Sequence, residues 1–546
     1  MSKMYRLFPV LLLGACAATA EPPGMAAAPV AQTVAAPAAE GAWRAATTAA
    51  DERAAAAGLA MLRAGGNAMD AAAAMMLALT VVEPQSSGIG GGGFLVLHRD
   101  GAAAPETFDG REKAPMAAGE DWFLDGAGKA LSRSVAVPGG KSVGVPGNVA
   151  MVALAHGKHG ALPWAKVFEP AIALARGGYV VTPRLERSIA ARADTLALTP
   201  EAKALYLGAD GKAKPVGTRI VNEPLAQTLE AIAKAGPQAF YTGPIAEDIV
   251  KRVQSAPMNP SPMTMADLAG YEAKARPPVC VGYRVWRVCS MGPPSAGGFT
   301  VSTILKQLEG FDLTALGPDS PVSWHLFAES SRLAYADWGT YGADSDVVAV
   351  PLAGLMDPAY MTARGKLIRA DARMATAPAG QPAGALAYTH APGGEVPSTT
   401  HFAAVDEMGN VAAWTSTVEG GFGSSLVARG MVLNNELTDF SFEPEEDGKP
   451  VANRVQGGKR PRSSMSPTIV YDADGRVVLS VGAAGGRTNS GAGGQGDHRR
   501  ARLEAAGGGC DCAAAGVCGR RPGVCRRRRD GGADGADRAG LEGAGA

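Results

Sequence analysis

A hydroxyl side chain at the start of a strand is the feature of this sequence best suited to chemistry. Thr399 opens a strand-like run that extends to Val405, and a second run follows the turn residues Gly409-Asn410. The pattern predicts a β-hairpin that begins at Thr399. A Thr hydroxyl is a weak nucleophile that needs a base nearby, and His401 is one candidate for that base. The alternative is that Thr399 is simply a good first residue for a strand.

Three motifs give this Thr a family context. They are Thr399-Thr400-His401, Asn434-Asn435-Glu436-Leu437-Thr438-Asp439-Phe440 and Ser463-Ser464-Met465-Ser466-Pro467. Together they resemble the small subunit of the γ-glutamyltransferases, which are N-terminal-nucleophile (Ntn) hydrolases. The resemblance covers roughly residues 45 to 487, and several matching motifs are more specific than one. It implies that the chain cuts itself between Ser398 and Thr399.

Cleavage there would free the amino group of Thr399 beside its own hydroxyl. The amine can take the hydroxyl proton directly or through a water molecule, so a separate base such as His401 is not required. The resemblance further implies that the hydroxyl of Thr417 supports the nucleophile. It also implies that Gly485 and Gly486 donate backbone N–H groups to the tetrahedral oxyanion. For Thr417 the alternative is plain strand propensity.

The resemblance assigns other residues to the α-amino and α-carboxylate groups of a substrate. Arg111 would hold the α-carboxylate, because a planar guanidinium donates two parallel hydrogen bonds to a carboxylate. Ser463 and Ser464 would assist it, and Asp439 would hold the α-ammonium with help from Glu436. The alternative for Arg111 is a solvated surface pair with a neighbouring acid.

Two positions depart from the best-known members of the family. Glu419 stands where they carry Asn, and Glu436 stands where many carry Gln. Three acids around one ammonium, with Asp439 as the third, would bind it strongly, and their mutual repulsion would raise a pKa. Residues 441–458 occupy the place of an active-site lid in many members.

Helices and a glycine run would position these residues. The sequence predicts a helix over Asp51 to Arg63 and a second one, capped by Asn67, that ends near Val82. The glycines of residues 88–93 then lead into a strand. They lack the Walker spacing and a preceding strand, so close backbone packing beneath the active site is favoured over phosphate binding.

The two ends of the chain differ in composition from its middle. The first 20 residues predict an export signal; Ala18-Thr19-Ala20 fits an ordinary cleavage site and Leu13-Gly14-Ala15-Cys16 a lipoprotein site that would put a lipid on Cys16. Residues 21–44 are a predicted Ala/Pro-rich linker. We therefore expect a periplasmic protein, and of the two cleavage sites we favour the lipoprotein site, which would anchor the protein through Cys16.

Residues 488–546 turn abruptly to Gly, Ala, Arg and Asp. Four of the seven Cys lie there without the paired spacing of a zinc site. We interpret this tail as a coding sequence read in a shifted frame from about Thr488. Cys280 and Cys289 flank a predicted hairpin, where they either pair or remain two free thiols.

The sequence as a whole predicts an α/β Ntn-hydrolase, an αββα sandwich of two mainly antiparallel sheets between helical layers. A large subunit of residues 45–398 and a small subunit of residues 399–487 would arise from the same chain. Its expected substrates are glutathione and other γ-glutamyl amides, its acceptors water or an amino acid, and it needs no metal or organic cofactor. The balance of 52 basic and 52 acidic residues gives no reason to expect nucleic acid as a partner. The alternatives are a glutaryl or cephalosporin acylase of the same fold and an inactive surface protein.

Overall fold

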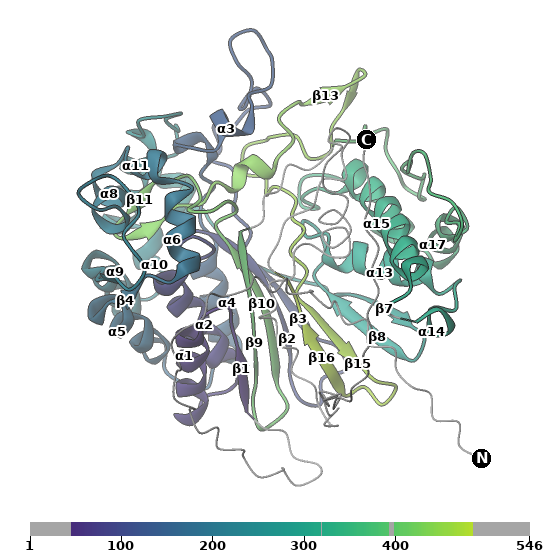
Figure 1. The fold of residues 1–546 in the computed structure, drawn as a ribbon, viewed down its shortest axis with the longest axis horizontal. Coiled ribbons are helices and arrows are strands. Elements are labelled where there is room, and N and C mark those ends of the chain that lie inside the picture. Colours follow the sequence, from purple (N-terminus) through teal and green to yellow (C-terminus); the bar gives the residue numbers. More distant parts are fainter. Residues whose placement is uncertain (1–44, 318, 392–397, 484–546) are drawn as a thin grey trace, which may run out of the picture.

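Two β-sheets lie face to face between two layers of helices (Figure 1). This arrangement comes from a computed structural model that describes residues 45–317, 319–391 and 398–483. The predicted signal segment, the linker, the tail and both glycines at 485 and 486 lie outside these ranges. The predicted αββα sandwich is confirmed in the described part of the chain.

The first sheet has six strands, each antiparallel to its neighbours. In spatial order they are β1 (Ala46–Thr48), β9 (Thr399–Val405), β10 (Val411–Thr417), β2 (Gly92–His98), β3 (Glu106–Asp109) and β6 (Lys274–Arg276). The hairpin β9–β10 is the one predicted from the sequence, with the turn at Gly409-Asn410. Its register places Thr399 opposite Thr417.

Side chains of the hairpin alternate between two apolar layers. Phe402 and Trp414 stack with ring centroids 5.6 Å apart and belong to the core that the first helical layer covers. Val405 and Ala413 point the other way, into the core between the sheets. Since side chains alternate along a strand, Thr399 shares the inner face with Val405.

The first helical layer begins with α1 (Glu52–Arg63) and α2 (Ala68–Val82), as predicted. Asn67 caps α2, and Asp70 completes a capping box by accepting from the backbone N–H of Asn67. The glycine run follows, and it packs on backbone. A Cβ on Gly90 or Gly91 would lie 2.0 Å from the carbonyl oxygen of Val432 or Thr417. The packing interpretation of these glycines is therefore confirmed.

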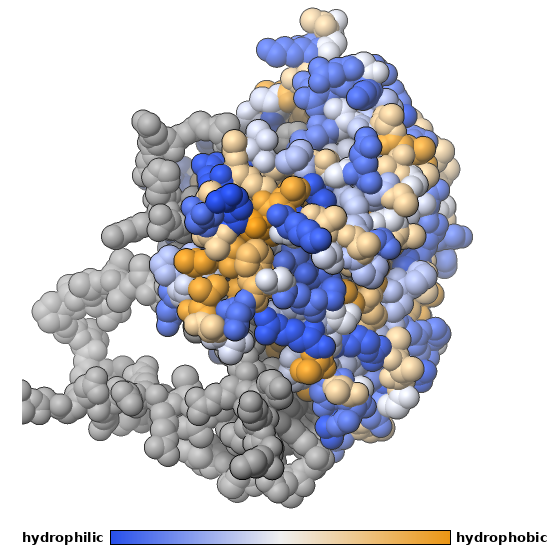
Figure 2. All heavy atoms as spheres, turned by 90° about the vertical axis from the view of Figure 1, so that its right-hand side faces the viewer, coloured by the Kyte–Doolittle hydropathy of each residue, from blue (hydrophilic) through white to orange (hydrophobic). Residues whose placement is uncertain are grey.

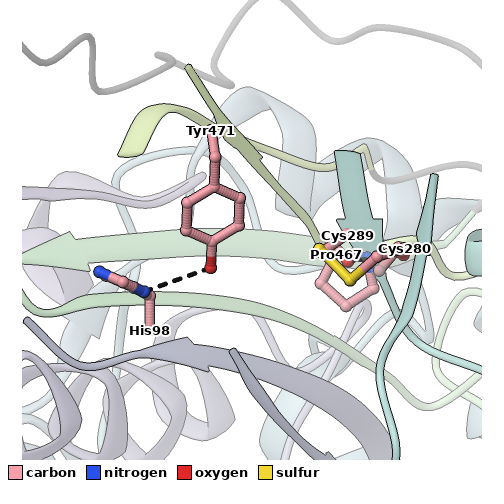
Figure 3. Close-up of a disulfide and its surroundings, with 6 residues drawn as sticks. His98, Cys280, Cys289, Pro467 and Tyr471 are labelled. Carbon is pink, nitrogen blue, oxygen red and sulfur yellow. Dashed lines mark hydrogen bonds between the residues drawn. A yellow bond between two sulfur atoms is a disulfide. The ribbon is translucent and has the colours of Figure 1, made fainter. Parts of the chain in front are cut away.

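The second sheet is also antiparallel. Its four described strands, in order, are β16 (Val477–Val481), β15 (Thr468–Tyr471), β8 (Trp286–Ser290) and β7 (Val279–Tyr283). Cys280 and Cys289 are directly opposite each other on β7 and β8 and form a disulfide with a Cα–Cα distance of 4.1 Å (Figure 3). Pairing, rather than two free thiols, is what the structure shows. On the same sheet the hydroxyl of Tyr471 reaches Nδ1 of His98 on β2 at 3.2 Å, which links the two sheets.

The second helical layer comprises mainly α13 (Gly297–Leu308), α15 (Pro321–Tyr341) and α17 (Pro358–Gly365). The predicted core helix around residues 323–338 is α15, and Leu326 and Leu333 on it are buried. Figure 2 shows the outer face on this side, where polar side chains surround an apolar patch. Polar residues on most of this face are expected of a layer in contact with solvent.

The remaining helices and strands complete the described part of the chain. They are α3 (Arg133–Ala136), η1 (Gly140–Ser142), α4 (Asn148–His159), η2 (Trp164–Phe168), α5 (Glu169–Gly177), β4 (Tyr179–Val180), α6 (Pro183–Ala190), α7 (Ala193–Leu196), α8 (Pro200–Tyr206), β5 (Arg219–Ile220), α9 (Glu223–Ala235), α10 (Gln238–Tyr241), α11 (Gly243–Gln254), α12 (Met265–Ala269), α14 (Leu313–Leu316), α16 (Leu352–Leu355), β11 (Val427–Ala428), β12 (Met431–Val432), η3 (Glu436–Asp439), β13 (Glu445–Glu446) and β14 (Lys449–Pro450). Across the described ranges, no helix combines the length and apolar content needed to cross a bilayer.

Candidate active site

Thr399 and Thr417 meet at one end of the β9–β10 hairpin. They are paired across the two strands, and their Oγ1 atoms are 3.1 Å apart. Both side chains are buried, Thr399 with 8% of its surface exposed. The structure thus places the predicted nucleophile in hydrogen-bond contact with the residue predicted to support it.

The hydroxyl of Thr417 also contacts the peptide bond that is predicted to break. It donates to the carbonyl oxygen of Ser398 at 3.0 Å and accepts from the backbone N–H of Glu419 at 2.8 Å. A hydroxyl has a single proton, so the remaining bond with Thr399 must have Thr399 as its donor. The network polarises the Ser398 carbonyl and holds the Thr399 oxygen beside it.

His401 has a different partner. Its Nδ1 shares a hydrogen bond of 2.9 Å with Oγ1 of Thr415 on the neighbouring strand. Burial lowers the pKa of the His401 ring to about 4, so the ring is neutral at pH 7. No bond to Thr399 is present among the described residues, and the structure does not support His401 as the base.

Arg111 lies just after β3, and its side chain is fully buried. Its Nε and Nη2 donate to the carbonyl oxygens of Pro461 and Arg462, at 3.1 and 2.7 Å. On its other side Nη2 donates to Oδ2 of Asp439 at 2.6 Å, and Nη1 donates to Oε1 of Glu436. The surface-pair alternative for Arg111 is therefore wrong.

Two carboxylate oxygens in this cluster have no hydrogen-bond partner. Oε2 of Glu436 and Oδ1 of Asp439 are buried and unpaired. Both residues belong to η3, which lies within the predicted motif, and both contact Arg111. A buried unpaired carboxylate oxygen is unfavourable unless a donor arrives, so these two atoms can accept hydrogen bonds from an ammonium group.

Glu419 forms hydrogen bonds with Arg133 and Asn435. Its Oε1 accepts from Nη2 of Arg133 at 2.8 Å, and its Oε2 accepts from Nδ2 of Asn435 at 2.5 Å. Arg133 thus balances the charge of Glu419, and the expectation that Glu419, Glu436 and Asp439 share one ammonium stays a prediction. Arg133 carried no signal in the sequence, since it lies far from every motif.

The two serines lie next to the Arg111 cluster along the chain. Ser463 follows Arg462, whose carbonyl accepts from Arg111. The backbone N–H of Ser463 donates to the carbonyl oxygen of Pro294 at 2.9 Å, and its Oγ accepts from the N–H of Met465 at 3.2 Å. Ser464 is partly exposed. The expected role of the two serine hydroxyls in holding the α-carboxylate stays a prediction.

Two further residues near the site, Gln85 and Glu112, were not predicted. Oγ of Ser398 donates to the carbonyl oxygen of Gln85 at 2.7 Å, which fixes the residue before the cleavage site against the segment after α2. Glu112 is fully buried 3.9 Å from Nη1 of Arg111. Its place beside Arg111 in the sequence was the one available signal.

Within residues 441–458, β13 and β14 form a hairpin whose tip, residues 445–449, is exposed at the outer edge of the molecule (Figure 1), whereas Val451, Ala452 and Asn453 are buried. Its base is fixed by Lys459, whose Nζ donates to the carbonyl oxygens of Ala452 and Arg454 at 2.7 and 2.9 Å. Burial lowers the pKa of the Lys459 ammonium to about 7. The role of this segment as a lid stays a prediction.

Comparison with known proteins identifies the family. The model of the family described as gamma-glutamyltranspeptidase matches residues 54–492. The chain belongs to the γ-glutamyltranspeptidase family. The predicted family, and with it the prediction of an enzyme, is thereby confirmed.

Relatives and solved structures agree with this family. The glutathione hydrolase proenzyme of Bacillus subtilis (strain 168) is 38% identical over 412 residues, 74% of this chain and 68% of that protein. The γ-glutamyltranspeptidase of Helicobacter pylori has 35% identity and a TM-score of 0.57, over 60% of this chain and 92% of the other. A cephalosporin acylase from Bacillus halodurans superposes with a TM-score of 0.68 at 26% identity, over 84% and 81% of the two chains.

Proposed function

We propose that this γ-glutamyltranspeptidase cuts its own chain before Thr399 and then hydrolyses or transfers the γ-glutamyl group of glutathione and similar amides. The observation that carries the proposal is a pair of hydrogen bonds that joins the hydroxyl of Thr399 to the hydroxyl of Thr417 and the hydroxyl of Thr417 to the carbonyl of Ser398. It gives a nucleophile, a polarising donor and a target carbonyl in one network.

Self-cleavage follows from this network in two steps. The Thr399 oxygen attacks the Ser398 carbonyl carbon while the Thr417 hydroxyl donates to the carbonyl oxygen. The bond from Ser398 to the Thr399 nitrogen breaks, the nitrogen takes up the proton that the Thr399 hydroxyl releases, and an ester joins the two residues. Water then hydrolyses the ester, which leaves a carboxylate on Ser398 and a free amine on Thr399.

The freed residue repeats the same chemistry on a substrate. Its amine takes the hydroxyl proton, and its oxygen attacks the γ-carbonyl carbon of a γ-glutamyl amide. The proton passes to the leaving amine, and a glutamyl ester forms on Thr399. Water gives hydrolysis and an amino acid gives transfer. Gly485 and Gly486 are proposed to donate to the oxyanion, as expected from the family motif.

The Arg111 cluster supports an α-amino acid substrate over a glutaryl one. Arg111, aided by Ser463 and Ser464, would hold the α-carboxylate, and the open oxygens of Glu436 and Asp439 would accept from the α-ammonium. A glutaryl side chain has no ammonium and would leave both oxygens unpaired. The acylase remains the second candidate because a cephalosporin acylase shares the fold.

We also propose that the protein works in the periplasm. The disulfide between Cys280 and Cys289 supports an oxidising compartment. The export signal predicted at the start of the chain and the lipid on Cys16 are part of this proposal. Globomycin blocks the cleavage of lipoprotein signals. Protein from treated cells should therefore keep its full signal segment if Cys16 is the lipidated residue, and should be processed normally if it is not.

A denaturing gel with N-terminal sequencing tests the proposal. We expect two fragments, the smaller beginning at Thr399, and a single band from Thr399→Ala. The matched control Thr400→Ala should still be cut, because Thr400 points to the opposite face. Uncut wild-type protein would favour the inactive surface protein. Cut protein that prefers glutaryl to γ-glutamyl p-nitroanilide would favour the acylase.

A further inference from the structure

Glu112 is a buried acid to which the proposed reaction gives no role. Its side chain is fully inaccessible, and neither carboxyl oxygen has a hydrogen-bond partner. Burial raises the pKa of Glu112 to about 8, more than the nearby Arg111 lowers it. The carboxyl therefore carries its proton near neutral pH, and it has an unused carbonyl oxygen.

The carboxyl of Glu112 lies between the nucleophile and the substrate cluster. Thr399, Thr417 and Gly92 are opposite one another on three neighbouring strands. Directly opposite residues on antiparallel strands face the same side, and a Cβ on Gly92 would lie 2.5 Å from Oε2 of Glu112. Glu112 thus fills the place of the side chain that Gly92 lacks, on the inner face that carries both hydroxyls.

The other neighbour of the same oxygen is the guanidinium of Arg111. Oε2 of Glu112 is 3.9 Å from Nη1, the nitrogen that donates to Glu436. The remaining nitrogens have other acceptors, since Nε and Nη2 donate to Pro461, Arg462 and Asp439. If the carboxylate of Glu436 turns toward a ligand, Nη1 is therefore the guanidinium nitrogen that loses its hydrogen-bond acceptor.

We propose that Glu112 is a positioning residue that accepts from Nη1 of Arg111 when the α-ammonium of the substrate engages Glu436. The Arg111 guanidinium then keeps its orientation and can still hold the α-carboxylate. This inference rests on the proposed substrate class. It predicts that Glu112 matters for ligands with an α-ammonium and is unimportant for ligands without one.

The test compares Glu112→Leu, which removes the acceptor, with Glu112→Gln, which keeps a carbonyl oxygen in nearly the same place. Titration calorimetry of the cleaved protein measures the Kd of L-glutamate and of glutarate. We expect the Leu variant to bind L-glutamate about tenfold more weakly, since a hydrogen bond to a charged group is lost. Its Kd for glutarate should stay unchanged, and the Gln variant should match the wild type for both.

The same variants are assayed with γ-glutamyl p-nitroanilide. KM should rise with the Kd of glutamate in the Leu variant while kcat changes little. If Glu112→Leu does not fold, Glu112→Asp, whose carbonyl oxygen is one methylene farther from Nη1, should weaken glutamate in the same selective way. The inference is overturned by equal losses for L-glutamate and glutarate, by equal losses in the Leu and Gln variants, or by no loss at all.

Binding also separates this inference from the proposed reaction. Wild-type protein that binds L-glutamate but releases no p-nitroaniline would refute the reaction, while the selectivity of the variants still decides the role of Glu112. Protein that does not bind L-glutamate would overturn both.

Discussion

The hydroxyl of Thr417 donates to the carbonyl oxygen of Ser398, accepts from the N–H of Glu419 and contacts the oxygen of Thr399. In the proposed self-cleavage this hydroxyl would stabilise the oxyanion on Ser398, and the loss of one such donor slows acyl transfer about 100-fold or more. Thr417→Ala should therefore slow self-cleavage by about that factor, whereas Thr417→Ser keeps the hydroxyl and should be cut normally. Quantifying the fragments over time on a gel measures the rate. Equal rates for the two variants would contradict the network.

His401 gives a prediction about acid stability. In the folded protein, burial lowers the pKa of the His401 ring to about 4 from its ordinary 6.5. The unfolded chain therefore binds a proton at His401 more readily than the folded protein does. Stability from this residue is complete above pH 6.5 and is lost as the pH falls toward 4, a total of about 3 kcal/mol. His401→Gln should flatten the dependence of unfolding free energy on pH in this window.

The glycine turn between α2 and β2 packs directly against the backbone that carries the site residue Thr417. A Cβ at Gly91 would lie 2.0 Å from the carbonyl oxygen of Thr417, and this backbone belongs to the central hairpin. Gly91→Ala should cost at least about 2 kcal/mol of stability, at the level of severe overpacking, and should impair self-cleavage because Thr417 shifts. Gly126→Ala is the matched control, since nothing lies within 4 Å of its Cβ position. Thermal unfolding of both variants provides the comparison, and similar melting temperatures would refute the close packing.

At the scale of the whole molecule, the second sheet takes strands from both predicted subunits. β7 and β8 precede Thr399, β15 and β16 follow it, and the hairpin joins β1 to β2 in the first sheet. Cleavage at Thr399 would therefore leave two fragments that share both sheets. We expect them to remain associated after the cut and to separate only on denaturation.

The tail gives a prediction of its own. Within the described residues β16 has one strand partner, β15, so a further strand could extend the sheet on its free side. If the frame shifts near Thr488, another frame of the gene should encode a continuation with alternating apolar residues. The protein made from the corrected gene should melt at a higher temperature and mature more completely than this chain. Resequencing that finds one frame and no such continuation would refute the shift.

Local patterns in the sequence determined the hairpin, the first two helices and the family. Hydrophobic periodicity, caps and turn residues act over a few positions, so Thr399 at the start of β9 and Asn67 at the cap of α2 were readable from neighbouring residues. The motifs also named Arg111, Glu436 and Asp439. Their recognition needed only residue types and spacing.

Only the tertiary structure decided how these residues share charge. Glu419 pairs with Arg133, which is separated from it by most of the chain, and Glu112 reaches the site because Gly92 leaves room for it. The pairing of Cys280 with Cys289, one of two open alternatives, depended on strand register. Each of these contacts depends on which distant backbones approach each other, and the packing of the two sheets fixes that approach.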